Sequence, residues 1–164
     1  MAVIPIRTIP DTVLREKAKW VKVINNSVKQ LIEDMIETMH AASGLGLAAP
    51  QIGVPLRVIV IGLPGEEEIA LINPKIIRRT GERLVGEGCL SIPGYRGQVK
   101  RAASVKVKAL DRHGNEIRIK SDELLAQALE HEIDHINGVL YIDHLDNLED
   151  LVKIDPSDDQ GRSI

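Results

Sequence analysis

The stretch SDELLAQALEHEIDHING, residues 121–138, decides how the rest of the chain must be arranged. Ser121 or Asp122 can cap a helix whose first turn is acidic, and Gly138 stands where such a helix would end. Apolar residues lie nearly all round this helix, at Leu124, Leu125, Ala126, Ala128, Leu129, Ile133 and Ile136. A helix with that distribution is expected to be buried against a sheet.

Strand-like patterns fill the middle of the chain and suit the sheet that such a helix needs. They cover residues 56–61, 69–72, 75–79, 105–109 and 116–120, and Asp111–Asn115 is typical of a hairpin connection between the last two. Strands followed by a helix, without regular βαβ alternation, predict an α+β fold. In it, mixed or antiparallel sheets pack around the central buried helix.

An earlier helix is predicted over residues 27–41, where apolar residues recur at helical spacing. Ser27 and Gln30 stand at capping-box positions, and Gly44 is placed as a C-cap. Residues 1–20 are expected to be irregular, with one helical turn after Pro10.

Length and composition limit the range of functions. The 164 residues suit one compact domain, predicted over residues 1–154, and the polar segment 155–164 is expected to be a frayed tail. A net charge of -3 without long blocks of either sign, and only 2% aromatic residues, disfavour nucleic acid as a partner. No apolar run approaches the roughly 20 residues of a membrane span, so we expect a cytoplasmic protein.

The strongest chemical signal is HEIDH, residues 131–135, inside the buried helix. Because residues four apart share one helical face, His131 and His135 can both reach one metal ion, while Glu132 approaches a bound water. The alternative is that these are ordinary charges on a helix surface. Charged groups on an otherwise apolar helix are costly unless paired or metal-bound, so the context favours a site.

Two other segments are ambiguous when each is taken alone. Cys89, the only cysteine, is as a single residue more often a small buried hydrophobe than a ligand, although Gly86 and Gly88 beside it allow the close backbone approach that a ligand loop needs. GLGLAAPQ, residues 44–51, lacks the ending of a phosphate loop and is by itself typical of a tight helix-to-strand connection. Its Gln51 could donate a hydrogen bond to an oxyanion.

Taken together, GLGLAAPQ at 44–51, EGCLS at 87–91 and HEIDH at 131–135 resemble the three motifs of the peptide deformylase family in sequence, order and spacing. The resemblance covers about residues 5–145. It implies one divalent metal ion held by Cys89, His131 and His135, natively Fe²⁺, for which Zn²⁺, Ni²⁺ or Co²⁺ can substitute. The substrates it implies are N-formylmethionyl nascent peptides, met near the ribosome by a monomeric enzyme.

The resemblance also implies roles for other residues. Glu132 is the general base, and Gln51 and the backbone N–H of Leu90 stabilise the oxyanion of the reaction that releases formate. Glu87 orients the site through a buried pair with Arg101. The residues expected to contact substrate are Leu45, Gly46, Arg96, Leu124 and Ala128.

The sequence departs from the family pattern at two places. Glu130 stands where the family commonly has Gln before its H-E-x-x-H, and the segment after Asn147 is short and polar instead of a long amphipathic helix. Two other functions are considered. The first is a zinc endopeptidase, which H-E-x-x-H alone also fits, although no third His follows at the metzincin spacing. The second is a catalytically silent metal-binding module, which the intact Glu132, Gln51 and Cys89 disfavour.

Overall fold

The computed structural model of the protein describes residues 2–155 and 163–164. Its two α-helices are α1 (Asn26–Ala41) and α2 (Glu123–Ile136). The strands are β1 (Gly46–Ala48), β2 (Val58–Ile61), β3 (Ile69–Thr80), β4 (Arg83–Cys89), β5 (Ile92–Arg101), β6 (Ser104–Leu110), β7 (Glu116–Asp122) and β8 (Val152–Lys153). Short 3-10 turns occupy η1 (Thr12–Arg15), η2 (Ala49–Ile52), η3 (Tyr141–His144) and η4 (Leu148–Asp150).

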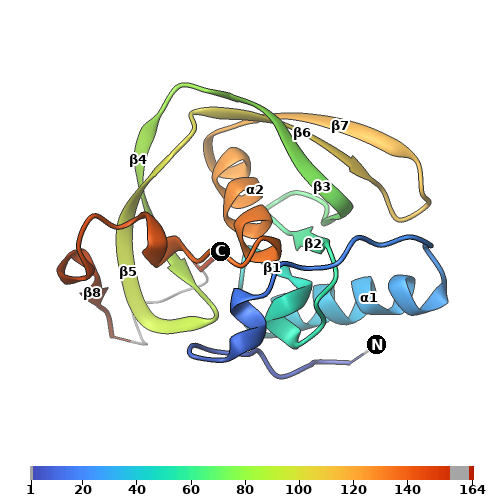
Figure 1. The fold of residues 1–164 in the computed structure, drawn as a ribbon, viewed down its shortest axis with the longest axis horizontal. Helices are drawn as coiled ribbons and strands as arrows, with labels where there is room; N and C mark the ends of the chain where they lie inside the picture. The colour runs from blue at the N-terminus through green and yellow to red at the C-terminus, as the bar shows by residue number, and fades with distance from the viewer. Residues whose placement is uncertain (1, 156–162) are drawn as a thin grey trace.

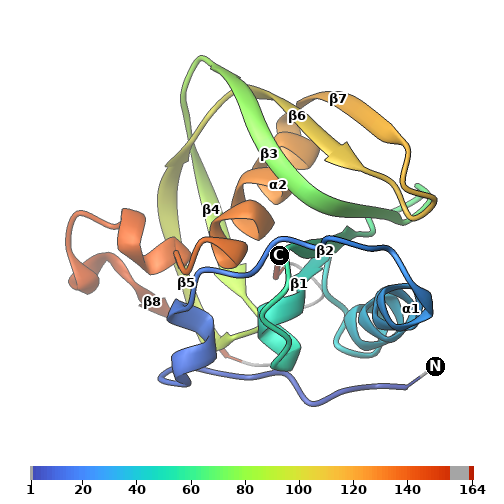
Figure 2. The same ribbon diagram turned by 45° about the vertical axis from the view of Figure 1, so that its right-hand side comes forward.

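Two antiparallel sheets enclose helix α2, which confirms the predicted α+β fold. The larger sheet has the strand order β1-β2-β3-β6-β7, and the smaller has the order β4-β5-β8. Figure 1 shows the long strands β3 and β6 arching over α2 and continuing into β4 and β5 on its other side. The turned view in Figure 2 shows α2 between the two sheets, with α1 beside β1 and β2.

The short strand β2, of sequence VIVI, is buried along its whole length because a helix covers each of its faces. Ile59 and Ile61 belong to the apolar cluster that contains the α2 residues Ala128, Leu129 and Ile133. Val58 and Val60 point the other way and join the cluster formed by α1. The two-residue period of a strand thus divides β2 between two cores.

Helix α1 begins close to its predicted start, but Ser27 is not its cap. Asn25 holds the N-cap position, where its side chain accepts a hydrogen bond from the backbone N–H of Val28. At the other end Ala42 is the C-cap, and Ser43 takes a positive φ of 54°, so Gly44 is not the cap either. The N-cap is therefore an asparagine two residues before Ser27, in place of the expected capping box.

The sequence pattern missed most of the smaller sheet. Strands β4 and β5 contain Gly86, Gly88, Gly94 and Gly97 together with Pro93, which weaken any strand signal. The two predicted strands 69–72 and 75–79 are one strand, β3, with a register shift between Ile72 and Lys75. The predicted hairpin is confirmed: Asp111 accepts hydrogen bonds from the backbone N–H groups of His113 and Asn115 between β6 and β7.

Asn73, at the shift in β3, anchors the irregular N-terminal segment. Its Oδ1 accepts from the Val21 backbone N–H at 2.9 Å, and its Nδ2 donates to the Val21 carbonyl at 2.9 Å. The buried side-chain amide of Asn73 therefore makes the same two hydrogen bonds with the Val21 backbone that a residue of a neighbouring strand would make.

The end of the chain differs from the frayed segment that its composition suggested. Ser163 and Ile164 are buried, at 4% and 2% exposure, whereas residues 156–162 lie outside the described part of the chain. Among the described residues, no helix combines the length and the apolar character that crossing a membrane would require.

Candidate metal centre

Helix α2 carries two imidazoles into the interior between the sheets. His131 and His135 are separated by one turn and are both buried, so they lie on the same face of the helix. Their rings meet edge to face with centroids 5.0 Å apart. The predicted helical spacing therefore holds, and the burial that the apolar pattern implied is confirmed.

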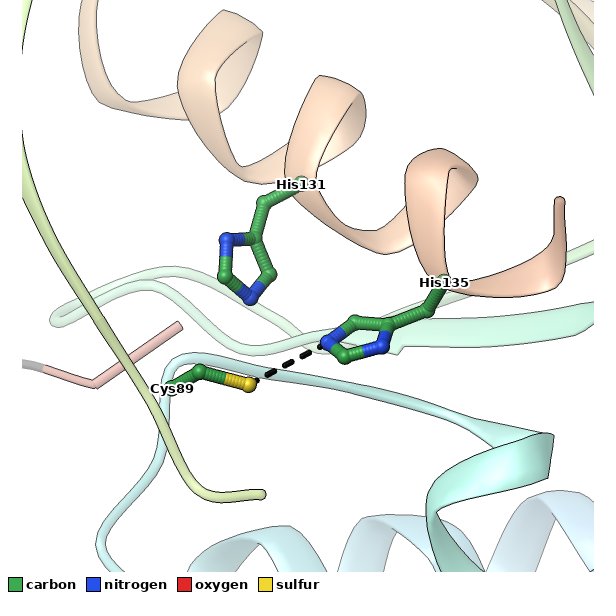
Figure 3. A group of neighbouring side chains, drawn as sticks. All are labelled: Cys89, His131 and His135. Atoms are coloured by element: carbon green, nitrogen blue, oxygen red, sulfur yellow. Dashed lines mark hydrogen bonds between the residues drawn. The ribbon is translucent and has the colours of Figure 1, made fainter. Parts of the chain in front are cut away.

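Cys89 reaches these imidazoles from the last residue of β4. A register shift between Glu87 and Cys89 interrupts the pairing of β4 with β5. Such an irregularity re-aims a side chain relative to a regular strand. Cys89 Sγ lies 3.3 Å from His135 Nε2, and Figure 3 shows the thiol facing both rings.

These three side chains form a group that could hold a metal ion. One ligand atom from each of Cys89, His131 and His135 lies within 4.8 Å of the other two. His131 Nε2 is buried and has no hydrogen-bond partner among the described residues. A buried nitrogen without a partner is costly unless something binds it, and one thiolate with two imidazoles suits Zn²⁺ or Fe²⁺. The donor set therefore fits a metal.

The other nitrogen of His131 is held by Glu87, as a metal-binding imidazole usually requires. Glu87 Oε1 lies 2.7 Å from His131 Nδ1, which leaves Nε2 directed at the site. Arg101 donates to both carboxylate oxygens of Glu87, from Nε at 2.6 Å and from Nη2 at 2.7 Å. Burial alone would raise the pKa of Glu87, but these hydrogen bonds and charges lower it to about 2. The predicted Glu87–Arg101 pair is present.

Two residues that sequence reasoning did not single out extend this support to the surface. Asp134 Oδ2 accepts from Arg101 Nη1 at 2.7 Å and lies 2.8 Å from His144 Nε2. Asp134 is the fourth residue of HEIDH, where its position between the two histidines was the available signal. His144 carried no signal, since η3 brings it to Asp134 only in the folded chain.

Glu132 lies beside the metal group with a carboxylate that is not otherwise engaged. Both of its oxygens are buried and have no hydrogen-bond partner among the described residues. Burial, the largest influence, raises the pKa of Glu132 to about 7. Gly46 borders this carboxylate so closely that a Cβ at position 46 would overlap Glu132 Oε2. The glycine therefore leaves room for the acid.

Gln51 reaches the metal group from the turn η2. Its Oε1 accepts the backbone N–H of Ala48 at 2.9 Å, which fixes the direction of the amide. Its Nε2 donates to Ser91 Oγ at 3.0 Å and lies 3.8 Å from Cys89 Sγ. Ser91, also buried, was missed as a partner although it belongs to EGCLS. Leu90 follows Cys89 and is half-buried beside Gly44.

The residues expected to contact substrate lie on α2, on β5, and at or just before the start of β1. Leu45 packs on the cluster that includes the fully buried Ala128, and Leu124 lies one turn earlier on α2 with 38% exposure. Arg96, on β5, donates to the Gly86 carbonyl at 3.3 Å. Leu45 and Ala128 therefore share one apolar wall.

The unusual Glu130 points away from the metal group. Its Oε1 accepts from the Ala102 backbone N–H at 2.6 Å, and its Oε2 accepts from Arg79 Nε at 3.2 Å. Its charge is therefore engaged by Arg79, on the β3 side of α2.

Comparison with known proteins gives consistent matches over the chain. The family model described as polypeptide deformylase matches residues 3–151. A peptide deformylase of Dehalococcoides mccartyi is 52% identical over 165 residues, covering 100% of this chain and 99% of that protein.

Two solved structures agree with this match in their folds. The crystal structure of a peptide deformylase from Legionella pneumophila is 48% identical, with a TM-score of 0.87, over 90% of this chain and 89% of the other. That from Synechococcus elongatus, in complex with actinonin, is 42% identical, with a TM-score of 0.88, over 92% of this chain and 82% of the other.

Proposed function

This chain belongs to the peptide deformylase family, and from that premise we propose how its residues remove the formyl group from the N-terminal methionine of newly made proteins. The observation that carries the proposal is the buried carboxylate of Glu132, which lies beside the Cys89, His131 and His135 group and has no hydrogen-bond partner in the described part of the chain. Substrates of this kind are met in the cytoplasm near the ribosome, and there we place the protein, as a monomer.

We assign one divalent ion to Cys89, His131 and His135, with Fe²⁺ as the native metal. When bound, such an ion lowers the pKa of a water molecule and polarises the carbonyl that is attacked. Glu87 and Arg101 hold His131 in the tautomer that presents Nε2. Burial lowers the pKa of His135 well below its usual value, which favours the neutral imidazole that binds metals.

Glu132 is assigned the proton transfers. As a carboxylate it accepts a proton from the attacking water, whose oxygen forms a bond to the formyl carbon. The same carboxyl then delivers this proton to the leaving nitrogen as the C–N bond breaks, so that formate and a free amino terminus are produced. Burial raises the pKa of Glu132, which makes its carboxylate a stronger base than that of an exposed glutamate.

Gln51 and the backbone N–H of Leu90 are assigned to the oxyanion that forms when water adds to the formyl group. A preorganised donor contributes most where its direction is already fixed. The hydrogen bond from Ala48 to Gln51 Oε1 supports this role, because it fixes which side of the amide carries the donors. Leu45, Gly46, Arg96, Leu124 and Ala128 are assigned to substrate, with the apolar members forming the pocket for the methionine side chain.

The assignment of Glu132 is tested by Glu132→Gln, which keeps the volume but removes the basic oxygen. We expect kcat on a formyl-Met peptide to fall by about 10²–10⁴-fold while the metal content stays equal. Glu149→Gln, at an exposed position on η4, is the matched control and should change neither quantity. Formate release and metal stoichiometry are measured on the same sample, with an acetyl-Met peptide to detect general amide hydrolysis.

Two results would contradict the assignment. Turnover of Glu132→Gln within tenfold of the unaltered protein would remove Glu132 from the proton transfers, and loss of the metal would make it a ligand or a support. Cleavage of internal peptide bonds would favour an endopeptidase.

A further inference from the structure

The buried pair Ser163–Ile164 lies across the two sheets beside the metal group. The backbone N–H of Leu45 donates to the Ser163 carbonyl at 3.0 Å, and the backbone N–H of Ile164 donates to the Gly88 carbonyl at 3.2 Å. Leu45 precedes β1 of the larger sheet and Gly88 belongs to β4 of the smaller one. The pair therefore bridges the edges of both sheets.

Both anchoring residues are immediate neighbours of the site. Leu45 precedes Gly46, which borders the Glu132 carboxylate, and Gly88 precedes the metal-group residue Cys89. On one side, the segment is held one residue away from Gly46, the neighbour of Glu132. On the other side, it is held one residue away from Cys89. The segment is therefore held directly beside the metal group.

The side chain of Ile164 fills apolar space on the same wall. Ile164 is 2% exposed and belongs to the cluster that contains Ala128 and Leu129 of α2, against which Leu45 also packs. Ser163 lies beside Gly88, where a Cβ would be 3.4 Å from Ser163 Oγ and 3.3 Å from Arg96 Nη1. Leu45, Ala128 and Arg96 are three of the residues assigned above to substrate.

We propose that Ser163–Ile164 is an internal competitor that occupies the groove for the substrate peptide and must leave before substrate binds. The inference rests on the proposed function for the identity of that substrate. Extended peptides are commonly captured by backbone hydrogen bonds at a strand edge, with a pocket for a side chain, and the segment uses both features. In this proposal the formyl-methionyl chain uses the Leu45 N–H, the Gly88 carbonyl and the apolar wall that the segment now occupies.

The competition is tested by releasing the segment without touching the groove. Ile164→Asp places a charge in apolar surroundings and should expel the segment, and deletion of Ser163 and Ile164 is the second variant. An internal competitor reduces apparent affinity by the fraction of molecules that are open. We therefore expect KM for a formyl-Met peptide to fall about tenfold, with kcat within roughly twofold. Leu148→Asp, which alters an exposed leucine on η4, is the matched control.

Two further measurements do not depend on turnover. Calorimetry with the product peptide Met-Ala-Ser should show tighter binding to both variants than to the unaltered protein, by the same factor. Hydrogen exchange at the Leu45 amide should become faster, because its acceptor on Ser163 is gone. Equal affinity for Met-Ala-Ser, or a fall in kcat without a fall in KM, would show that the segment supports the site structurally and would overturn the proposal.

Failure of the proposed function has a different signature. In that case the metal-loaded protein and its variants would all leave the formyl-Met peptide uncleaved. The calorimetric comparison would still decide whether the segment competes for the groove.

Discussion

Replacing Arg101 by leucine would leave the Glu87 carboxylate buried with His131 as its one remaining polar partner among those described. Arg101 and Glu87 are 1% and 0% exposed along their side chains, and two hydrogen bonds join them. Removing one member of such a buried pair typically costs about 3–5 kcal/mol, since the other charge stays in the interior. Burial alone would raise the pKa of Glu87, but the hydrogen bonds and charges of Arg101 and His131 together lower it to about 2, so the carboxylate is ionised at neutral pH.

The same substitution should weaken metal binding, because Glu87 holds His131 in its binding orientation. Removal of such an orienting contact usually costs about 10–100-fold in metal affinity. Urea unfolding of the metal-free protein measures the loss of stability, and competition with a chelator measures the affinity. Arg112→Leu, which breaks the half-exposed pair with Glu33, should cost at most about 1 kcal/mol and leave metal affinity unchanged.

A double substitution separates the two effects. Glu87→Gln combined with Arg101→Leu removes both charges, so it should recover part of the stability lost by Arg101→Leu alone but none of the metal affinity. A loss of less than about 1 kcal/mol for Arg101→Leu, or an unchanged metal affinity, would refute the reasoning that this pair positions His131.

Three smaller predictions follow from other contacts. Gly46→Ala should lower kcat by about 100-fold at unchanged metal content, because the new methyl group displaces Glu132; kinetics with metal analysis checks this, and full activity would contradict it. Glu130→Gln should keep activity and change the free energy of unfolding by at most about 1 kcal/mol, since an amide oxygen can still accept the backbone N–H; a loss of metal would count against this. Asp143→Asn breaks the ion pair with Arg15 and should lower the free energy of unfolding by at most about 1 kcal/mol at pH 7. Burial raises the pKa of Asp143, but the hydrogen bonds from Arg15 and the Leu140 backbone outweigh it and lower that pKa. Because that pKa is lowered, the difference in unfolding free energy between the two proteins should be complete above about pH 4 and should vanish as the pH falls through the pKa of Asp143 in the folded protein. A difference that does not change with pH in urea unfolding would contradict this.

The residues of the site were more predictable than the sheet that supports them. The local spacing of HEIDH was enough to single out His131, Glu132 and His135, whereas Cys89 and Gln51 were assigned through the resemblance of the three motifs together to the family pattern. Helix α2 was equally clear because its apolar residues run nearly all round it. Local spacing therefore pointed to the two histidines of the metal group, and the resemblance added Cys89.

What the sequence could not supply depends on contacts between distant segments. Strands β4 and β5 are rich in glycine, and their pairing comes from the register of one strand against the other. His144 joins Asp134 only because η3 packs beside α2, and Ile164 is buried by a groove that its polar neighbours in sequence do not reveal. Pairing and docking of this kind leave no periodic signal along the chain.

Asn73 has a further consequence for chemical ageing of the protein. Asparagine deamidates when the backbone nitrogen of the next residue attacks the side-chain amide, and Asn73 is followed by Pro74, which has no N–H. The Asn73 side chain is thus protected from deamidation. Deamidation would replace its amide with a carboxylate, which could no longer donate to the Val21 carbonyl. Asn137, exposed and followed by Gly138, has no such protection, and it lies two residues after His135. In peptide maps of stored protein, we expect deamidation to accumulate at Asn137 while Asn73 stays intact; the opposite order would contradict this.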